Sequence, residues 1–337
     1  MSSPRSRTGS HSGGRCAATA RSRTGSHSGG RCAATAKNRG RAELALAGVT
    51  VVWGSTFVVV QSAIRSVSPL LFLALRFTLA ALVLGAVYAG AIRKQRMRIS
   101  IWLWPGIAAG LLLFTAYVFQ TVGLEYTSAS KSAFLTGLSI PLVPFVSSFV
   151  YRNRPRLLEV AGVLIASAGM ALMTLPSGKL AISRGDFLSA MCAVAFAFHI
   201  VLIGHYAPLI GFETIAVVQV VTAAALGLMT FWVAQPVAAH FTFEVAAAVL
   251  ITGMLATALA FTTMAWAQQY TSATRAALIF ALEPVVAWLT SFLLNGERMA
   301  GRAIFGACLI LTGIVMVELK RTDVRKHHKE RVADPDV

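Results

Sequence analysis

The sequence predicts an all-helical integral membrane protein with ten transmembrane helices arranged as two inverted five-helix repeats. Of the 337 residues, 56% are hydrophobic and 13% are charged, whereas a soluble domain has roughly 45–50% apolar and about 25% charged residues. The apolar residues form stretches long enough to span a bilayer, and motifs of the first half recur in the second. This composition excludes an ordinary water-soluble domain.

Residues 1–41 form a basic tail that we expect to be disordered. The segment 5–20, RSRTGSHSGGRCAATA, is repeated without change at 21–36 as a 16-residue tandem duplication. Such a composition cannot form a core, and the tail lacks the apolar run of a secretory signal. The tail has nine Lys and Arg residues and no acid. Because the basic excess lies on tails and loops, no nucleic-acid partner is predicted.

From residue 42 the chain consists of apolar stretches of about 19–24 residues, the length of a helix that crosses a hydrocarbon core of roughly 30 Å. Backbone groups in lipid must pair internally, and strands would need only half this length, so we expect helices. The ten stretches run over 42–64, 69–91, 101–123, 129–151, 156–175, 186–207, 212–234, 245–268, 273–294 and 301–319.

Matching motifs divide this region into two repeats, 42–175 and 186–319. YTSAS at 126–130 recurs as YTSAT at 270–274, an offset of 144 residues. Further matches at offsets of 143 or 144 relate Glu43 to Asp186, Gly162 to Gly306, and Gly169 to Gly313. Because five is odd, the second repeat must enter the membrane in the opposite direction. Inverted repeats of this kind are typical of secondary transporters.

The distribution of Lys and Arg predicts that both termini are cytoplasmic, because positively charged loops stay on that side of the membrane. Basic clusters occur at 93–98, at 152–156 and in the C-terminal tail, 320–337. We therefore expect an integral protein of the plasma or inner membrane.

Three segments resemble the EamA-type members of the drug/metabolite transporter superfamily: WGSTF at 53–57, ALRF at 74–77, and WAQQYTSATRAALIFALEPVVAWLTSFLLNGE at 266–297. The resemblance covers residues 42–319. It implies a ten-helix carrier with a central cavity between the repeats, used to export metabolites, amino acids or drugs. The chain departs from the family at Arg154, where the first repeat often carries a glutamate after helix four.

Glu283 is the acid that lies deep within a predicted helix, and Pro284 follows it. An intramembrane carboxylate is costly, so it suggests a functional site, here one for a substrate amine or a proton. The structural alternative is a carboxyl group that stays protonated or caps a helix broken at Pro284.

Arg76 lies within the second helix and cannot lose its proton. We expect a structural anchor whose stem snorkels to the headgroups, with a coupling role as the alternative. His199 suggests either proton coupling or a packed histidine. Gln219 is expected to form a hydrogen bond between helices.

Further cavity residues are predicted from side-chain type and from the resemblance. Gln120 is a cavity candidate because Tyr117 lies one turn before it on the same helix face. The resemblance places the helices of four aromatic residues around the cavity, and these residues are Trp53, Tyr117, Phe198 and Trp266.

These observations predict a secondary-active exporter of small solutes that works by alternating access. An organophosphate or nucleotide-sugar antiporter is the alternative, but it would need several cavity cations for phosphate. A membrane-embedded enzyme is the remote alternative, and it would need paired acids or a metal set. No cofactor, metal site or catalytic residue is predicted. Proton coupling is left open, as is the choice between monomer and homodimer.

The orientation can be tested with single cysteines at Gln95 and Asn153, in a background that lacks the four native cysteines. Both positions should resist an impermeant thiol reagent in intact cells and react after permeabilisation, because both loops are expected to be cytoplasmic. Labelling of both from outside would contradict the orientation.

Overall fold

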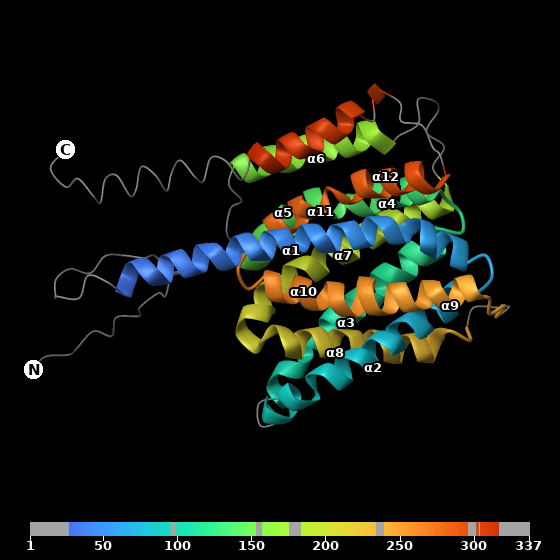
Figure 1. The fold of residues 1–337 in the computed structure, drawn as a ribbon, viewed down its shortest axis with the longest axis horizontal. Coiled ribbons are helices and arrows are strands. Elements are labelled where there is room, and N and C mark those ends of the chain that lie inside the picture. The colour runs from blue at the N-terminus through green and yellow to red at the C-terminus, as the bar shows by residue number, and fades with distance from the viewer. Residues whose placement is uncertain are drawn as a thin grey trace, which may run out of the picture.

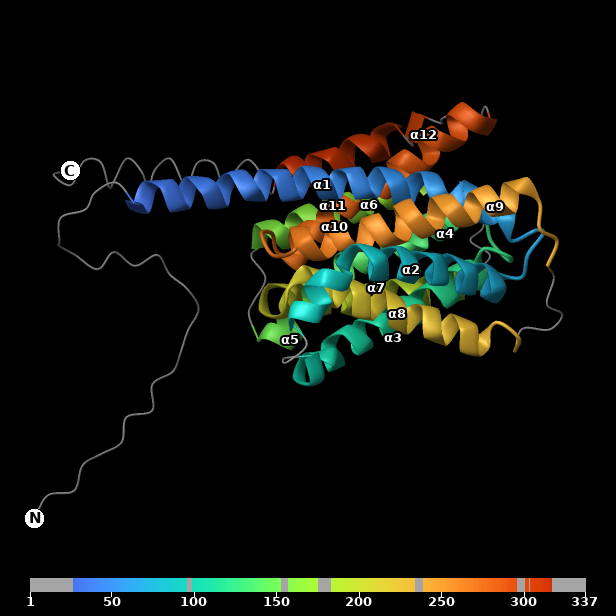
Figure 2. The ribbon, with the colours of Figure 1, turned by 60° about the horizontal axis from the view of Figure 1, so that its bottom comes forward.

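The computed structural model describes residues 27–95, 99–152, 157–174, 183–233, 239–295, 301–302 and 304–316. The elements are α1 (His27–Ala63), α2 (Pro69–Gln95), α3 (Ile99–Gly123), α4 (Ala129–Gly137), α5 (Ser139–Tyr151), α6 (Leu157–Thr174), α7 (Arg184–Ile210), α8 (Phe212–Thr230), α9 (Phe243–Leu250), the π-helix η1 (Ile251–Leu259), α10 (Ala260–Ala267), α11 (Ala273–Phe280) and α12 (Glu283–Asn295). The helices run side by side in a bundle (Figure 1). In Figures 1 and 2, α12 and α8 lie on opposite sides of α1.

Eight helical segments are long and apolar enough to cross a membrane. Three of them combine several elements: α4 with α5, α9 with η1 and α10, and α11 with α12. Two further apolar helices, Leu157–Leu172 and Ile304–Met316, are shorter. No strand occurs among the described residues, where Val67 and Ala239 form one isolated bridge. The all-helical membrane architecture is confirmed, whereas the count of ten crossings stays a prediction.

The predicted boundary between the tail and the first helix is wrong. Because α1 begins at His27, residues 27–41 are helical where composition predicted disorder, while residues 1–26 lie outside the described part of the chain. Extending an existing helix costs far less than nucleating one. The Ala-rich segment 32–39 therefore continues the long apolar helix that follows it.

Several features that support the predicted orientation fall outside the described residues. They are the basic loop residues 96–98 and 153–156, which include Arg154, and the tail 320–337. The orientation therefore stays a prediction.

The repeated Tyr-Thr-Ser motifs start two equivalent helices. The Ser128 hydroxyl accepts a hydrogen bond from the backbone N–H of Lys131 at the start of α4. In the same way, the Ser272 hydroxyl accepts from the backbone N–H of Arg275 at the start of α11. A serine before the first helical residue satisfies an amide that has no partner within the helix. The motif is repeated because each half begins a helix at this point.

Glycines that the repeat relates to one another bring α6 against the closing helix, 304–316. A side-chain carbon added to Gly169 would lie 2.5 Å from the carbonyl oxygen of Gly306, and one added to Gly313 would lie 2.5 Å from that of Gly162. Small residues allow such close backbone contact between membrane helices. Because the contact is the same in both directions, it has the self-complementarity of a two-fold interface.

The same reciprocity relates two contacts in the centre of the bundle. A carbon added to Gly110 on α3 would lie 2.6 Å from the carbonyl oxygen of Gln219, and one added to Gly253 on η1 would lie 3.1 Å from that of Arg76. The offset of 143 relates Gly110 to Gly253 and Arg76 to Gln219. The two halves thus build the same helix contact twice.

The π-helix η1 marks an insertion in the second half. The repeat offset is 143 between Gly110 and Gly253 but 144 between Tyr126 and Tyr270. One extra residue must therefore lie between Gly253 and Tyr270. A single π-helical turn inside an α-helix accommodates such a residue, and η1 overlaps this interval.

Replacing Gly169 with alanine should lower the free energy of unfolding by about 1–3 kcal/mol, because the added methyl group overpacks the contact with Gly306. Gly85→Ala on α2 is the matched control, since nothing lies within 4 Å of its added carbon. The control should be neutral or stabilising by up to about 1 kcal/mol. Thermal unfolding in detergent measures the stability of both variants. If Gly169→Ala and Gly85→Ala change the stability equally, the close contact at Gly169 is contradicted.

Candidate functional site

A cavity in the middle of the bundle is lined by both halves of the chain. Elements α1 to α5 form one part of its wall, and α7, α10, α11 and α12 form the other. Its aromatic residues are Trp53, Phe57, Tyr117, Phe196, Phe261 and Phe280. Its polar side chains are Thr56, Arg76, Gln120, Thr136, Ser139, His199 and Glu283. An apolar wall with a few polar groups is the usual composition of a small-molecule site.

Two membrane helices are interrupted beside this cavity. Leu138 separates α4 from α5, and Ala281 and Leu282 separate α11 from α12. The breaks are equivalent, because Leu138 and Leu282 are 144 residues apart. The new half-helices begin with Ser139 and Glu283, which both line the cavity. Half-helix N-termini at the centre of a membrane protein are a recurrent feature of transporter sites.

The helix break at Glu283 is stabilised from two sides. Pro284 has no backbone N–H, which disfavours a continuous helix at this point. On the other side, α1 packs against the break through Gly54, where an added side-chain carbon would lie 2.8 Å from the Glu283 carbonyl oxygen. The glycine of WGSTF therefore lets α1 approach the irregular backbone, while its neighbour Trp53 lines the cavity.

The Glu283 carboxylate has no hydrogen-bond or ion-pair partner among the described residues. Its side chain lines the cavity. A charged carboxylate in a water-poor interior is costly unless it is paired. The oxygens of Glu283 are therefore available to an occupant of the cavity or to a proton.

Arg76 on α2 is 2% exposed, and other protein groups hold its guanidinium. Nε donates to the Thr257 hydroxyl at 2.7 Å, and one terminal nitrogen donates to the Tyr117 hydroxyl at 3.0 Å. The guanidinium carbon lies 4.2 Å from the centroid of the Tyr117 ring, a cation–π contact. The expectation that Arg76 snorkels to the headgroups is wrong, because these partners hold its charge inside the protein.

The π-helix supplies an acceptor for two cavity residues. The Ala256 carbonyl oxygen accepts from Trp53 Nε1 at 2.9 Å and from Arg76 at 3.4 Å. A change from α- to π-type bonding leaves a carbonyl without its usual helical partner, so a side chain can occupy it. The inserted residue in η1 therefore orients both Trp53 and Arg76.

Aromatic rings form a continuous part of the cavity wall. The Trp53 ring centroid lies 5.2 Å from those of both Phe261 and Phe280. The Tyr117 centroid lies 5.5 Å from that of Phe196 and 6.1 Å from that of Phe261. All four pairs are tilted or edge-on, which is the favourable arrangement for aromatic rings.

His199 lines the cavity and has one ring nitrogen without a partner among the described groups. Its Nε2 lies 2.8 Å from the Gln219 side-chain oxygen, which confirms the expected hydrogen bond of Gln219 between helices. With this amide oxygen as acceptor, Nε2 carries the hydrogen and Nδ1 of the neutral ring is an acceptor. Nδ1 is buried and has no partner among the described groups. The Gln120 amide, also in the cavity wall, donates to Thr136 at 3.2 Å.

Comparison with known proteins agrees with this architecture. The model of the EamA-like transporter family matches residues 40–175 and 183–319. The chain belongs to the EamA-like transporter family. It is 35% identical over 285 residues to an "Uncharacterized transporter" of Archaeoglobus fulgidus, which covers 83% of this chain and 86% of that protein. The family assigns the chain to membrane transport, with a small-molecule substrate and the lipid bilayer as its surroundings.

Two more distant similarities agree with the EamA-like assignment. The "Uncharacterized transporter YoaV" of Bacillus subtilis is 24% identical, over 81% of this chain and 95% of that protein. A solved structure titled "Crystal structure of protein" has a TM-score of 0.69 at 22% identity, and it covers 85% of this chain and 99% of the other. The latter similarity concerns the fold alone.

The EamA-like fold brings most of the predicted site residues together, but two aromatic residues lie elsewhere. Trp266 does not line the described cavity, and its ring packs on Tyr270 at 5.5 Å. Phe198 is also absent from the described wall and is 43% exposed. On a helix, Trp266 lies about 200° around the axis from Met264, which does line the cavity.

Sequence reasoning missed Phe196, Phe261, Phe280 and Ser139, which all line the cavity. The repeat offset could have identified three of them. Phe196 is the equivalent of Trp53 at an offset of 143. At an offset of 144, Ser139 is the equivalent of Glu283 and Phe261 is the equivalent of Tyr117.

Replacing Arg76 with glutamine should lower the free energy of unfolding by about 2 kcal/mol, because buried partners of a charged group lose their hydrogen bonds. It should also change the fluorescence of Trp53, which shares the Ala256 carbonyl with Arg76. Arg65→Gln is the matched control, since Arg65 is exposed in the turn after α1. Thermal unfolding and tryptophan emission in detergent measure the two effects. If the Arg76 and Arg65 variants behave alike, the role of Arg76 is contradicted.

Proposed function

We propose that this EamA-like chain is a secondary-active transporter that exports small amphipathic solutes by alternating access. The observation that carries this proposal is the cavity between the repeats, where two equivalent helix breaks meet and the Glu283 carboxylate has no partner among the described groups. Ten helices in two inverted repeats, 42–175 and 186–319, would give this cavity two similar arrangements that open to opposite sides.

The polar groups of the cavity favour a substrate with an N–H donor. The Glu283 carboxylate and His199 Nδ1 both accept hydrogen bonds and lack partners among the described groups. The aromatic wall around Trp53 and Tyr117 suits an apolar body or a cation. Together these groups support an amine attached to an apolar portion, as found among amino acids, amine metabolites and many drugs.

Glu283 is also the group best placed to couple transport to a proton gradient. A carboxyl group that exchanges a proton for the substrate amine would release the substrate when it is protonated, because the neutral form no longer pairs with a cation. Coupling and substrate binding would then use the same side chain.

An organophosphate or nucleotide-sugar antiporter has less support. Phosphate recognition needs several cationic donors directed at the substrate. Arg76 is the one cation among the described cavity residues, and its Nε and one of its two terminal nitrogens already donate to Thr257, Tyr117 and Ala256. A membrane-embedded enzyme has still less support, because the cavity wall contains one carboxylate and one histidine.

Replacing Glu283 with glutamine keeps the shape of the side chain and removes its charge. Loss of a charge-assisted hydrogen bond should weaken binding of an amine substrate about 10- to 100-fold. Proteoliposomes loaded with a panel of amino acids, amines and drugs, with and without a proton gradient, measure the effect. If Glu283 serves coupling alone, gradient-driven accumulation should be lost while passive exchange persists.

Glu244→Gln is the matched control, since Glu244 is exposed in the first turn of α9. It should transport like the parent chain. If Glu283→Gln inserts normally and also transports every substrate like the parent, Glu283 is structural and the site assignment is incorrect.

A further inference from the structure

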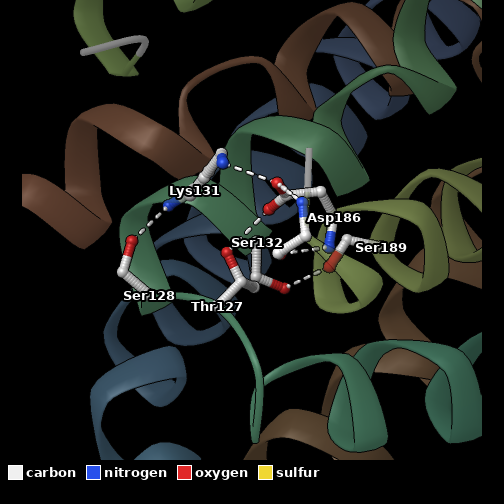
Figure 3. A network of polar contacts seen from close by, with 7 residues as sticks. Thr127, Ser128, Lys131, Ser132, Asp186 and Ser189 are labelled. Carbon is white, nitrogen blue, oxygen red and sulfur yellow. Dashed lines mark hydrogen bonds and ion pairs between the residues drawn. The ribbon is translucent and has the colours of Figure 1, made fainter. Parts of the chain in front are cut away.

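Two ion pairs connect the first repeat with the second. Lys131 Nζ lies 2.5 Å from an Asp186 carboxylate oxygen, and the Thr127 hydroxyl donates to the other oxygen at 2.8 Å. Figure 3 shows these three side chains converging between the start of α4 and the start of α7. A second pair joins Arg275 to Glu43, with the two nearest atoms 3.7 Å apart.

The two clusters are copies of one another. An offset of 143 relates Glu43 to Asp186, and an offset of 144 relates Lys131 to Arg275. The third member is copied as well, because Thr271, the equivalent of Thr127, has its hydroxyl 3.4 Å from Glu43. In each cluster a carboxylate from one repeat therefore meets a cation and a threonine from the other repeat.

The clusters lie at opposite ends of the bundle. Glu43 is near the start of the first membrane segment, Asn38–Ala63, and Gln61 is near its end. The Gln61 amide donates to the backbone carbonyl of Thr127 at 3.3 Å, which places the Asp186 cluster at that end. At 1.5 Å per residue, Glu43 and Gln61 are about 27 Å apart along the helix.

The two ends differ in this structure. Asp186 makes a short ion pair and also accepts from Thr127 and from the Ser183 backbone N–H. At the other end, the contacts of Glu43 with Arg275 and Thr271 are longer, and the same Glu43 oxygen accepts from Arg39 on its own helix at 2.7 Å. The repeats are therefore held tightly at the Asp186 end and more loosely at the Glu43 end.

The cavity lies closer to the Asp186 end of the bundle than to the Glu43 end. Its wall includes Val60, the neighbour of Gln61, and Leu124, three residues before Thr127. Toward the other end, the described lining of α1 stops at Trp53, which is ten residues or about 15 Å from Glu43. A solute that leaves the cavity by the shorter route must therefore pass the Asp186 cluster.

We propose that Lys131–Asp186 and Glu43–Arg275 are the two alternating gates of the path, each closed when the other opens. This inference rests on the proposed alternating access. If each repeat adopts the conformation that the other has in this structure, the Lys131–Asp186 contact lengthens and the Glu43–Arg275 contact shortens. In each pair one partner is buried and the other is about one-fifth exposed, Lys131 at 22% and Glu43 at 20%, so water can reach the contact when it breaks and re-forms during each cycle.

A single reporter cysteine at Ser139 can measure which end of the cavity is open. Ser139 lines the cavity, and serine and cysteine are similar in size. In a background without the four native cysteines, an impermeant thiol reagent is applied to the full chain from either face, in right-side-out and inside-out vesicles. Asp186→Asn opens its own end, because it removes the charge while the asparagine oxygen can still accept from the Ser183 backbone N–H in the capping box of α7.

The variants should move the reporter in opposite directions. Asp186→Asn and Lys131→Met should each raise labelling from the Asp186 face about two- to fivefold and lower it from the opposite face. Glu43→Gln and Arg275→Met should do the reverse. The double variant Asp186→Asn/Lys131→Met should shift labelling no further than either single variant, because both remove the same contact.

Arg184→Gln and Arg41→Gln are the matched controls. These residues are exposed, lie two positions before Asp186 and Glu43, and are themselves related by the offset of 143. They should label like the parent. If the gate variants also label like the parent, or if both pairs shift labelling in one direction, the gates are static clamps and the proposal fails.

The parent chain separates this failure from that of the proposed function. If the parent reporter reacts from both faces while the gate variants match the controls, alternating access stands and the gate assignment falls. If the reporter reacts from one face alone in the parent and in every variant, alternating access itself is contradicted.

Discussion

In the hydrocarbon core of a membrane, each backbone N–H and C=O needs a partner within the protein, and this constraint decides where the bundle can be irregular. The described helices are irregular at Leu138, at Ala281–Leu282 and along η1. The two breaks border the cavity, because residues on both sides of each one line it, and η1 is bonded to the cavity residues Trp53 and Arg76. The Ala256 carbonyl bonds to Trp53 and Arg76, and Gly54 lets α1 cover the break at Glu283.

The two EamA-like repeats share the same helix contacts, but they differ at the cavity. The glycine contacts of Gly162 and Gly169 with their equivalents are the same in both directions. In the cavity the copies differ, because Ser139 corresponds to Glu283 and Gln219 corresponds to Arg76. The carboxylate and the guanidinium thus belong to different repeats. A nearly symmetric frame thereby holds a polar, asymmetric site.

The helices are joined by one kind of interaction along their length and by another kind at their ends. Backbone contact through glycine fixes α6 against the closing helix 304–316, and such contact has little freedom to adjust. The links between the repeats at the two ends are ion pairs with threonine hydroxyls, and each pair has one partner that water can reach. Rigid pairs of helices connected by adjustable ends are compatible with motion of one half against the other.

The sequence by itself determined the all-helical membrane class, the repeat and the family, because apolar stretches and repeated motifs can be recognised without knowing how the helices pack. It also identified Glu283, Gln120 and His199, since polar residues in apolar helices are conspicuous. Only the tertiary structure decided that Arg76 is held by Tyr117 and η1, that Trp266 packs outside the described cavity, and that Phe57 and Phe280 form part of its wall. These outcomes depend on helix rotation and on partners from other helices, and no single helix encodes either of them.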